Sequence, residues 1–472
     1  MKKPVIITAL ALGLAACSVG PDYTPQKTSF LEGWFSPRSE HISNEEISLE
    51  WWRVFNDPLL EKYIGQAAAN NKNVQVALAN VKRARALRGE SNAAFFPQVN
   101  SSTSADRSKS SDAVATSGNG NIRNLYDAGF DASWELDIFG GNRRANEASN
   151  ARIGSAVAEY QDVMISTLAE VARNYYEARG LQKRISITEN NAELLQETFN
   201  VVDQRLEAGE ASSFDVSRAR GEYQLTRARI PNLQADLHAS IFTLSVLLGQ
   251  TPEALLEEMG VVKPLPTPPD IVPVGLRSDM LRRRPDVRMA ERELAASVAD
   301  IGVETAELFP KFFITGDIGS QARVFGDVFS AAGGVWSLAS LVQWSVFEGG
   351  AIRARIKVEE AESEAALAAY EQSVLSALAD AETALTRYGQ ELETRKRLAD
   401  GVKSRRQSVN FAKELFDAGE EDYLAVLDAE RELIASEDNL VVSETNSITK
   451  LIALYAALGG GWQIHIENQA GE

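Results

Sequence analysis

The sequence predicts a mixed, mainly α-helical fold built from two tandem repeats of about 210 residues. Three observations support this fold class. Apolar residues recur at alternating steps of three and four through residues 143–206, which contain no proline, and this pattern indicates one long helix. Strand-like segments precede that helix. The same landmarks then return, because Gly209 and Gly419 are separated by 210 residues, as are Gly249 and Gly459.

Residues 1–16 have the pattern of a bacterial export signal. Two lysines precede an apolar run that is too short to span a bilayer, and small residues then lead to Cys17, the only cysteine in the chain. The stretch Leu14-Ala15-Ala16-Cys17 resembles a lipobox. We therefore expect a signal peptide over 1–16, a covalent lipid on Cys17 and an extended arm over 17–57. An ordinary signal peptide with a chance cysteine is the alternative.

The composition excludes several classes of function. A net charge of −18 makes nucleic acid a poor partner. The three histidines are scattered, and the sequence has neither a nucleophile elbow nor a phosphate-binding loop. We therefore predict no enzyme, no metal site and no cofactor other than the lipid on Cys17.

The first repeat is expected over residues 58–249. Its second strand alternates apolar and polar residues, as a strand does when one side faces lipid. At about 1.5 Å per residue its long helix would measure roughly 95 Å, more than a globular core requires. The expected elements are a helix over 58–92, strands over 98–107 and 126–139, the long helix 143–206 and an antiparallel helix over 212–248.

The second repeat is expected over residues 278–461. It follows a proline-rich connector over 250–277 and precedes a tail over 462–472. The expected elements are a helix over 278–308, strands over 312–320 and 335–347, a second long helix over 351–417 and a last helix over 422–458.

Strand number predicts the oligomer. Four membrane-type strands cannot close a barrel, and lipid does not tolerate an open sheet edge. Two chains would give eight strands, whose interior side chains fill, whereas three chains would give twelve and leave a channel. We therefore predict a homotrimer with a 12-strand transmembrane β-barrel, four strands per chain, and a long α-helical barrel. An ordinary coiled-coil stalk would explain the helices but not the strands.

Several motifs together resemble those of one family. They are Cys17-Ser18-Val19-Gly20-Pro21-Asp22-Tyr23, Trp51-Trp52 with Phe55, Asp57-Pro58-Leu59, Arg282-Arg283-Arg284-Pro285-Asp286-Val287 and Leu427-Asp428-Ala429. Over essentially its whole length the chain resembles the TolC superfamily of outer-membrane channels, in particular the OprM-like (NodT) lipoprotein branch that serves resistance-nodulation-division (RND) efflux pumps.

The resemblance implies a passive trimeric duct from the periplasm to the outside, with the trimer inserted in outer-membrane lipid, its helical part in the periplasm and a gated periplasmic tip. It also implies two partners, a periplasmic adaptor (membrane fusion) protein and an inner-membrane RND transporter, and so a link to antibiotic resistance. A type I protein-secretion duct and a non-conducting trimeric stalk or adaptor are the alternatives.

The ends of the two helical hairpins hold the candidate gate residues. The resemblance implies a gate role for Asp428 and for Leu424 one turn before it, although a helix-start carboxylate and a core leucine are the simpler interpretations. Asp215 completes a Ser-x-x-Asp capping pattern, so capping is weighed above gating there. Arg218 occupies the repeat position of Asp428. We hypothesise an alternating ring of Arg218 and Asp428 that latches the closed tip.

The turns of the two hairpins are the predicted adaptor contacts. Each turn reads Ala-Gly-Glu, and the simpler interpretation is that each glycine only supplies a positive φ. The residues are Ala208, Gly209, Glu210, Ala418, Gly419 and Glu420.

Overall fold

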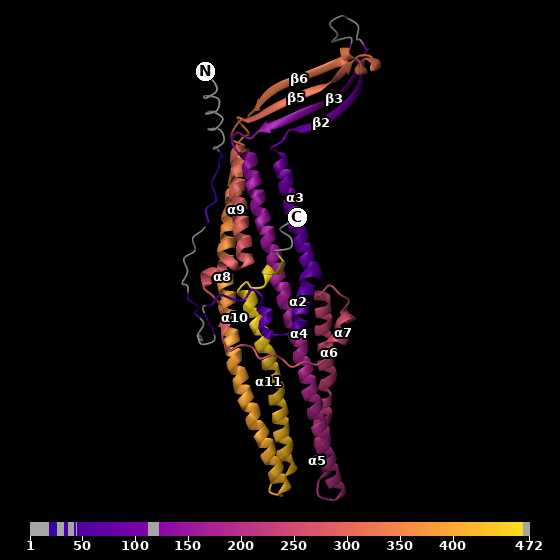
Figure 1. The fold of residues 1–472 in the computed structure, drawn as a ribbon, viewed down its shortest axis with the longest axis vertical. Helices are drawn as coiled ribbons and strands as arrows, with labels where there is room; N and C mark the ends of the chain where they lie inside the picture. Colours follow the sequence, from indigo (N-terminus) through magenta and orange to yellow (C-terminus); the bar gives the residue numbers. More distant parts are fainter. Residues whose placement is uncertain (1–17, 26–32, 36–41, 44, 112–121, 466–472) are drawn as a thin grey trace. The chain divides into compact units, whose positions relative to one another are not determined.

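The computed structural model describes residues 18–25, 33–35, 42–43, 45–111 and 122–465. The predicted signal peptide and Cys17 lie outside the described residues, as does most of the predicted tail. The described chain is mainly helical, as predicted (Figure 1).

Contacts divide the chain into two compact units. The unit named here the sheet unit holds the described residues within Met1–Lys27, Asn80–Val157 and Met289–Glu371. The hairpin unit holds those within Thr28–Ala79, Ala158–Arg288 and Gln372–Glu472. Each unit draws on both halves of the chain, so neither corresponds to one of the expected repeats.

The main elements follow one order twice. The first half contains α2 (Pro58–Asn70), α3 (Lys72–Ala93), β2 (Gln98–Lys109), β3 (Ile122–Leu136), α4 (Gly141–Glu207), α5 (Ser213–Arg227) and α6 (Arg229–Leu247). The second contains α8 (Arg277–Arg283), α9 (Pro285–Ala306), β5 (Lys311–Ala322), β6 (Gly334–Gln343), α10 (Ala351–Asp417) and α11 (Tyr423–Ala457). The long helices α4 and α10 have 67 residues each. The prediction for α10 is confirmed to the residue.

The connector between the halves is more structured than predicted. It contains the short helices η3 (Pro252–Leu255) and α7 (Leu256–Met259) and the strand β4 (Val272–Pro273). Strand β4 pairs in parallel with β1 (Ile42–Ser43), so the expected arm joins a two-stranded sheet. The other short elements are η2 (Trp51–Phe55), η4 (Phe325–Phe329), η5 (Ala331–Gly333) and η6 (Trp462–His465).

The expectation of one helix over 58–92 is wrong, because the chain breaks at Asn71 into α2 and α3. Asn71 is extended, at φ −60° and ψ 132°. Its Oδ1 accepts hydrogen bonds from the amides of Asn73 and Val74, at 2.9 and 3.2 Å, and its Nδ2 donates to the Leu247 carbonyl at 2.8 Å. A side chain that caps the next helix in this way stabilises the break.

Two other expected helices are interrupted at prolines. Arg284 separates α8 from α9 at φ −62° and ψ 123°, because the residue before a proline avoids the helical region and Pro285 then opens α9. The helix expected over 212–248 divides into α5 and α6 beside Pro231, which has no amide hydrogen to donate.

The four strands of the sheet unit form one antiparallel sheet in the order β2-β3-β5-β6 (Figure 1). Gln98 lies opposite Ser133, Phe130 opposite Ile318, and Ile318 opposite Trp336. In the described chain, β2 and β6 each pair on one side only.

The sheet has one apolar and one polar face, because side chains alternate along each strand. Phe130, Ile318 and Trp336 share the apolar face, where they are 60%, 65% and 78% exposed. The opposite face carries polar contacts: Asn100 donates to Asp131 at 3.1 Å, and Ser337 donates to Asp317.

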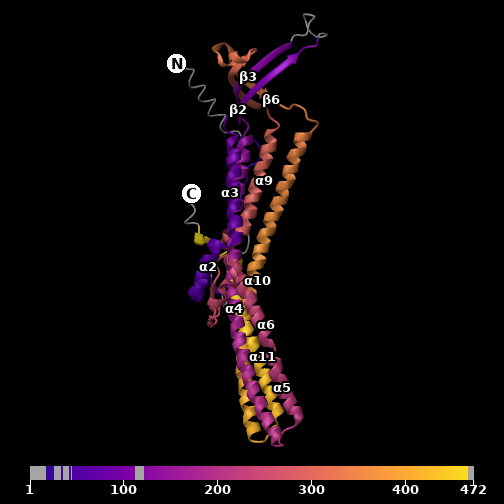
Figure 2. The same cartoon turned by 90° about the vertical axis from the view of Figure 1, so that its right-hand side faces the viewer.

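Four helices in the sheet unit follow the same order as the strands. Asn146 of α4 donates to Asn92 of α3, Arg152 of α4 pairs with Asp300 of α9 at 2.5 Å, and Arg355 of α10 pairs with Glu304 of α9 at 2.9 Å. The row is therefore α3-α4-α9-α10, and its outer members are the helices that adjoin the edge strands β2 and β6 (Figure 2).

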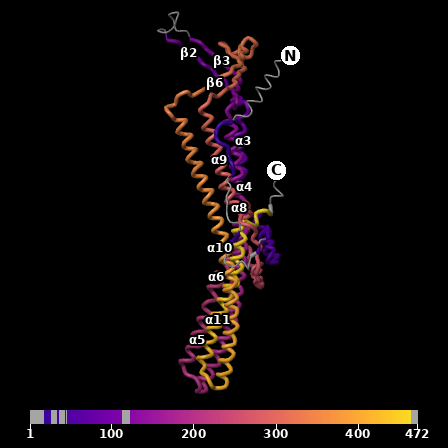
Figure 3. The backbone as a smooth tube through the Cα atoms, turned by 90° about the vertical axis from the view of Figure 1, so that its left-hand side faces the viewer, coloured from indigo at the N-terminus to yellow at the C-terminus, as the bar shows by residue number. Residues whose placement is uncertain are grey.

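The hairpin unit contains two helical hairpins. The end of α4 turns into α5, and α10 turns into α11, with both turns at the same end of the unit (Figures 2 and 3). Buried Leu195 of α4 contacts Leu427 and Ile434 of α11, which joins the two hairpins. Among the described residues, no single helix is long and apolar enough to cross a membrane. One bent pair of helices, Ser213–Leu247 with Pro252–Met259, has the length and composition of a membrane span when the two are taken together.

Candidate functional site

Both hairpin turns have the same backbone design. The Gly209 and Gly419 amides donate to the carbonyls of Leu206 and Phe416, each at 3.0 Å. The amides of the next residues, Glu210 and Glu420, donate to the carbonyls of Arg205 and Leu415, at 2.8 and 3.0 Å. This is the Schellman pattern, which requires a positive φ; Gly209 has φ 80° and Gly419 has φ 74°. All six Ala-Gly-Glu residues are exposed. The glycines therefore make the turns, and the adaptor contact stays a prediction.

The capping interpretation of Asp215 is confirmed. Its amide donates to Ser212 Oγ at 3.2 Å, while its Oδ2 accepts from the Ser212 amide at 3.0 Å, so the capping box is complete. The Ser212 hydroxyl and amide, with a smaller contribution from Arg218, hold the pKa of Asp215 below its ordinary value. In the second hairpin, Asp422 caps α11 alone by accepting from the Ala425 amide at 3.2 Å.

Arg218 and Asp428 meet within one chain. Arg218 Nη2 of α5 lies 2.7 Å from Asp428 Oδ1 of α11, and the two side chains are 30% and 53% exposed. An ion pair this exposed contributes only about 0.2–1 kcal/mol. The contact joins two oppositely charged residues that occupy equivalent positions in the two predicted repeats, 210 residues apart. The alternating ring of such pairs in a trimer stays a prediction.

Leu424 is half-buried in the first turn of α11, on the same side of the helix as Asp428 four residues later. Its neighbour Leu427 is buried in the contact between the hairpins. The core leucine of this turn is therefore Leu427. Leu424 keeps part of its surface exposed, and its gate role stays a prediction.

An ion pair with a buried carboxylate, close to the hairpin turns, was missed by sequence reasoning. The side chain of Glu430 is 0% exposed, and Lys413 Nζ of α10 lies 2.8 Å from its Oε1. Burial first, and then the negative charge of Glu430, raise the pKa of nearby Tyr423. The sequence held a signal for this pair, since Glu430 interrupts the apolar positions Val426, Leu427 and Ile434 on one helix face.

Aromatic contacts also link the hairpins near their turns. Arg205, in the last turn of α4, lies 4.1 Å from the centre of the Phe416 ring of α10. Phe416 in turn meets Tyr423 edge-on, with ring centres 5.5 Å apart. The two turns are therefore coupled by contacts as well as by the pair of Arg218 and Asp428.

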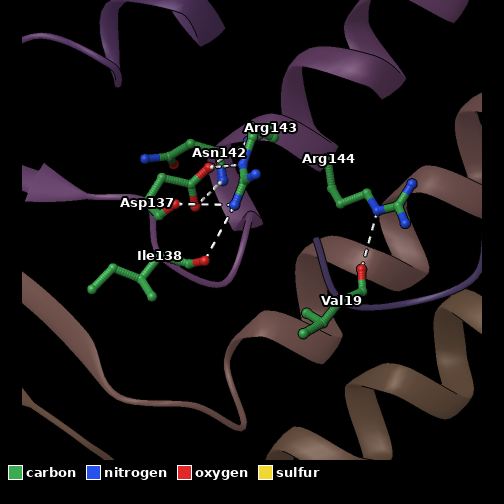
Figure 4. Close-up of polar contacts among 6 residues, drawn as sticks. All are labelled: Val19, Asp137, Ile138, Asn142, Arg143 and Arg144. Atoms are coloured by element: carbon green, nitrogen blue, oxygen red, sulfur yellow. Dashed lines mark hydrogen bonds and ion pairs between the residues drawn. The ribbon is translucent and has the colours of Figure 1, made fainter. Parts of the chain in front are cut away.

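The first described residues after Cys17 are held at the start of α4 (Figure 4). The Arg144 side chain is only 4% exposed, and its Nε donates to the Val19 carbonyl at 3.0 Å. Its Nη2 lies 2.6 Å from Asp22 Oδ1. Asp137 accepts from the amides of Asn142 and Arg143 at 3.2 and 2.9 Å and so caps α4.

Motifs that carried the family resemblance have structural roles. Asp57 caps α2 and also accepts from the Tyr175 hydroxyl at 2.6 Å. Trp51 stacks on Tyr455 with ring centres 5.7 Å apart. Arg284 pairs with Asp286 at 2.6 Å. None of these residues lies at the hairpin turns. Within the described residues, no group of three or more His, Cys, Asp or Glu residues is placed to hold a metal ion.

The comparisons with known proteins agree on one family. The family model of the outer membrane efflux protein matches residues 63–250 and 276–460. The chain is 27% identical to the toluene efflux pump outer membrane protein TtgF of Pseudomonas putida, over 98% of both chains. It is 28% identical to nodulation protein T of Rhizobium leguminosarum bv. viciae, over 96% of this chain and 92% of that one.

A solved structure extends the match to the fold. The outer-membrane channel OprN superposes with a TM-score of 0.90 and 36% sequence identity, over 95% of this chain and 100% of that one. The resemblance predicted from sequence is thereby confirmed. The chain belongs to the outer membrane efflux protein family, a group of TolC-superfamily channels of the outer membrane and not of enzymes.

Proposed function

We propose that this chain is the outer-membrane lipoprotein channel of a tripartite efflux pump, a passive homotrimeric duct from the periplasm to the outside. The four-stranded sheet carries this proposal. Its apolar face leaves Phe130, Ile318 and Trp336 exposed, its other face is polar, and within the described chain neither edge strand has a partner on its outer side. A sheet of this kind is suited to lipid only after closure into a barrel.

The strand directions allow that closure. Because the sheet is antiparallel throughout, β2 and β6 run in opposite directions, so β6 of one copy would meet β2 of the next as another antiparallel pair. Three copies would give the 12-strand barrel. The repeated element order further supports a tandem duplication, with one family model matching each half.

The hairpin turns form the periplasmic gate in this proposal. Three copies would bring three pairs of Arg218 and Asp428 to the narrow end, with Leu424 beside them. Each pair is weak on its own because it is solvated, which suits a latch that must open. The exposed turns at Gly209 and Gly419 would then meet the adaptor.

The partners follow from the relatives. TtgF is named as the outer membrane protein of a toluene efflux pump. By analogy we infer a periplasmic adaptor and an inner-membrane RND transporter for this chain, with a lipid on Cys17 and the helical part in the periplasm. The substrate class is set by those partners and not by the duct.

Conductance tests the duct and its latch together. The purified full-length protein in planar bilayers should conduct, and Arg218→Glu should raise its conductance because it places two carboxylates side by side. Asp428→Arg should do the same, while the double exchange should return the conductance toward the original value. Arg229→Glu, the same charge reversal at an exposed residue of α6, is the control.

The outcomes separate the alternatives. A protein that never conducts would support the non-conducting stalk and sink the duct. Conductance that Arg218→Glu leaves unchanged would sink only the latch. A duct that restores polypeptide secretion, but not solvent or drug efflux, in cells lacking their own channel would be a type I secretion duct.

A further inference from the structure

We propose that the end of the sheet farthest from the helices binds the phosphate groups of anionic glycolipids in the outer leaflet of the membrane. The binding residues are Arg107 and Lys109, which lie on the apolar face of the sheet. This inference rests on the proposed outer-membrane duct and goes beyond it, because it names a lipid and the side chains that would hold its headgroup.

Arg107 and Lys109 stand out because the apolar face is otherwise uncharged. Arg107 lies opposite Asn124 of β3, an even position on the same face as Phe130, and Lys109 lies opposite Ile122 in the same way. In the four described strands, every other charged residue lies on the polar face. Those residues are Asp106, Arg123, Asp127, Asp131, Glu135, Lys311 and Asp317.

The height of these two cations matches the level of lipid headgroups. The apolar face of β3 extends from Leu136, next to the helices, to Tyr126, which is about 33 Å along the strand. At the usual strand tilt this becomes roughly 25 Å along the membrane normal, the height of a lipid-facing band. Arg107 and Lys109 lie two and four residues beyond the row of Tyr126, so they begin where the apolar band ends.

An aromatic group lies on the same face at this height. It comes from η4, in the connection between β5 and β6 at the end of the sheet away from the helices (Figure 1). Phe325 meets Tyr126 edge-on with ring centres 5.5 Å apart, and Phe329 meets Phe325 at 5.7 Å. Phe325 and Phe329 are 61% and 80% exposed. Exposed aromatic rings favour the boundary between acyl chains and headgroups.

The connection is packed closely onto the apolar face. A Cβ on Gly333 would come closer than contact distance to the Ser320 hydroxyl and the Asp327 carbonyl. Ser320 lies two residues after Ile318 and therefore on the apolar face. The phenylalanines of η4 are thus held beside the strands, directly below the level of the two cations.

The two cations are available to a ligand. Within the described residues, the side chains of Arg107 and Lys109 are exposed and make no hydrogen bond or ion pair. In the connection, the single carboxylate of Asp327 is offset by Arg323. The group therefore keeps a net positive charge in a chain whose net charge is −18. A phosphorylated glycolipid offers phosphate at this height and acyl chains beside the aromatic rings below it.

Lipid binding tests this surface. Fluorescent lipid A should bind the detergent-purified full-length protein, and Arg107→Gln with Lys109→Gln should weaken that binding by roughly tenfold. Molar salt should weaken binding to the wild type toward the level of this variant. Arg123→Gln with Lys82→Gln is the control, because it removes the same charge from the polar face and from α3, and it should leave the affinity unchanged.

A second set of measurements separates the aromatic group and the phosphates. Phe325→Ser with Phe329→Ser should also weaken the binding of lipid A, because it removes the apolar part of the surface. Dephosphorylated lipid A should bind the wild type as weakly as lipid A binds the variant without the two cations. Inorganic phosphate should not displace lipid A, since it has no acyl chains, and displacement would overturn the assignment to a lipid.

Two results decide the inference. Equal affinity of the wild type for lipid A and for its dephosphorylated form would overturn it, and this result does not depend on any variant folding. Equal affinity of the wild type and of Arg107→Gln with Lys109→Gln would also overturn it, with conductance in planar bilayers showing that the variant is folded. A wild type that never conducts would instead overturn the proposed function.

Discussion

Arg144 shows how a single side chain determines the path of the N-terminal segment. Its guanidinium is buried and holds two backbone carbonyls and the carboxylate of Asp22. Close approach matters as well, because a Cβ on Gly20 would lie 2.5 Å from the Cα of Gly302. The segment that follows the predicted lipid site is therefore held against elements from both halves of the chain.

Replacing Arg144 should release this segment. In Arg144→Ala, the peptide covering residues 18–25 should lose most of its hydrogen-exchange protection, because the Val19 amide, which donates to Phe139, no longer lies in a fixed segment. The cost in free energy should be about 1–3 kcal/mol, typical of polar groups left without a partner. Arg152→Ala, which removes a more exposed ion pair, is the control. Unchanged protection of 18–25 would contradict this role.

The capping box at Asp215 predicts a specific pH dependence. Because the folded pKa of Asp215 lies below its ordinary value of 3.8, its carboxylate stabilises the start of α5 above that pH, and the contribution disappears as the pH falls through the folded pKa. Asp215→Ala should therefore destabilise the α5 start by about 0.5–1 kcal/mol at pH 5 and at pH 7 equally. Local hydrogen exchange measures this. A difference that grows as the pH drops below 3.8 would argue against the cap.

Sequence reasoning at this scale succeeded where chemistry is local. Ser212 and Asp215 are three residues apart, so the sequence pattern alone predicts the hydrogen bonds between them. It failed for the pair of Lys413 and Glu430, because helix geometry places Glu430 on a buried face without showing which cation lies opposite. The contact of Arg218 and Asp428 could be proposed only because the repeat related two positions 210 residues apart.

At the scale of elements, two glycines in the long helices have opposite roles. A Cβ on Gly180 of α4 would lie 2.2 Å from Thr445 Oγ1 of α11, so this glycine permits close helix packing. A Cβ on Gly401 of α10 would meet nothing within 4 Å. The same residue type is required at one place and costs helix stability at the other.

The two alanine substitutions should therefore differ in sign. Gly180→Ala should destabilise the protein by about 1–3 kcal/mol through overpacking, whereas Gly401→Ala should stabilise α10 by up to about 1 kcal/mol. Denaturant unfolding of each variant gives both values. Adding Thr445→Ala to Gly180→Ala removes the two nearest atoms and should recover part of the loss. Equal effects at both glycines would show that packing at Gly180 is unimportant.

Helix ends were predicted more accurately than helix interruptions. The glycine turns after α4 and α10 are strong local signals, and the predicted ends lie within one residue of those observed. The break at Asn71 combines two contacts. The cap on the Asn73 and Val74 amides is local, whereas the hydrogen bond to Leu247 joins residues 176 positions apart, and no local pattern contains it. Pro285 was a visible signal, since the residue before a proline resists the helical region.

At the scale of the whole molecule, the sequence repeat and the compact units divide the chain differently. The element order runs twice, yet each unit is assembled from both halves. Helix α4 contributes residues to both units, as does α10. Sequence periodicity revealed the repeated order because it is a property of the chain. The division into units depends on contacts between distant residues, which the periodicity does not contain.

The proposed closure of the sheets into a membrane barrel leads to the last prediction. Trp336 lies on the apolar face beside Ile318, and Ser337, the next residue, lies on the polar face and donates to Asp317. If the apolar face meets lipid, Trp336→Lys should lower the free energy of unfolding by up to about 2–4 kcal/mol, the cost of a lysine at the bilayer midplane, while Ser337→Lys should cost little because its ammonium can pair with Asp317. Urea unfolding of the protein inserted in liposomes compares the two variants. Because both introduce the same charge one residue apart, only the direction of the side chain distinguishes them, and a larger loss at Ser337 would reverse the assignment of the lipid-facing side.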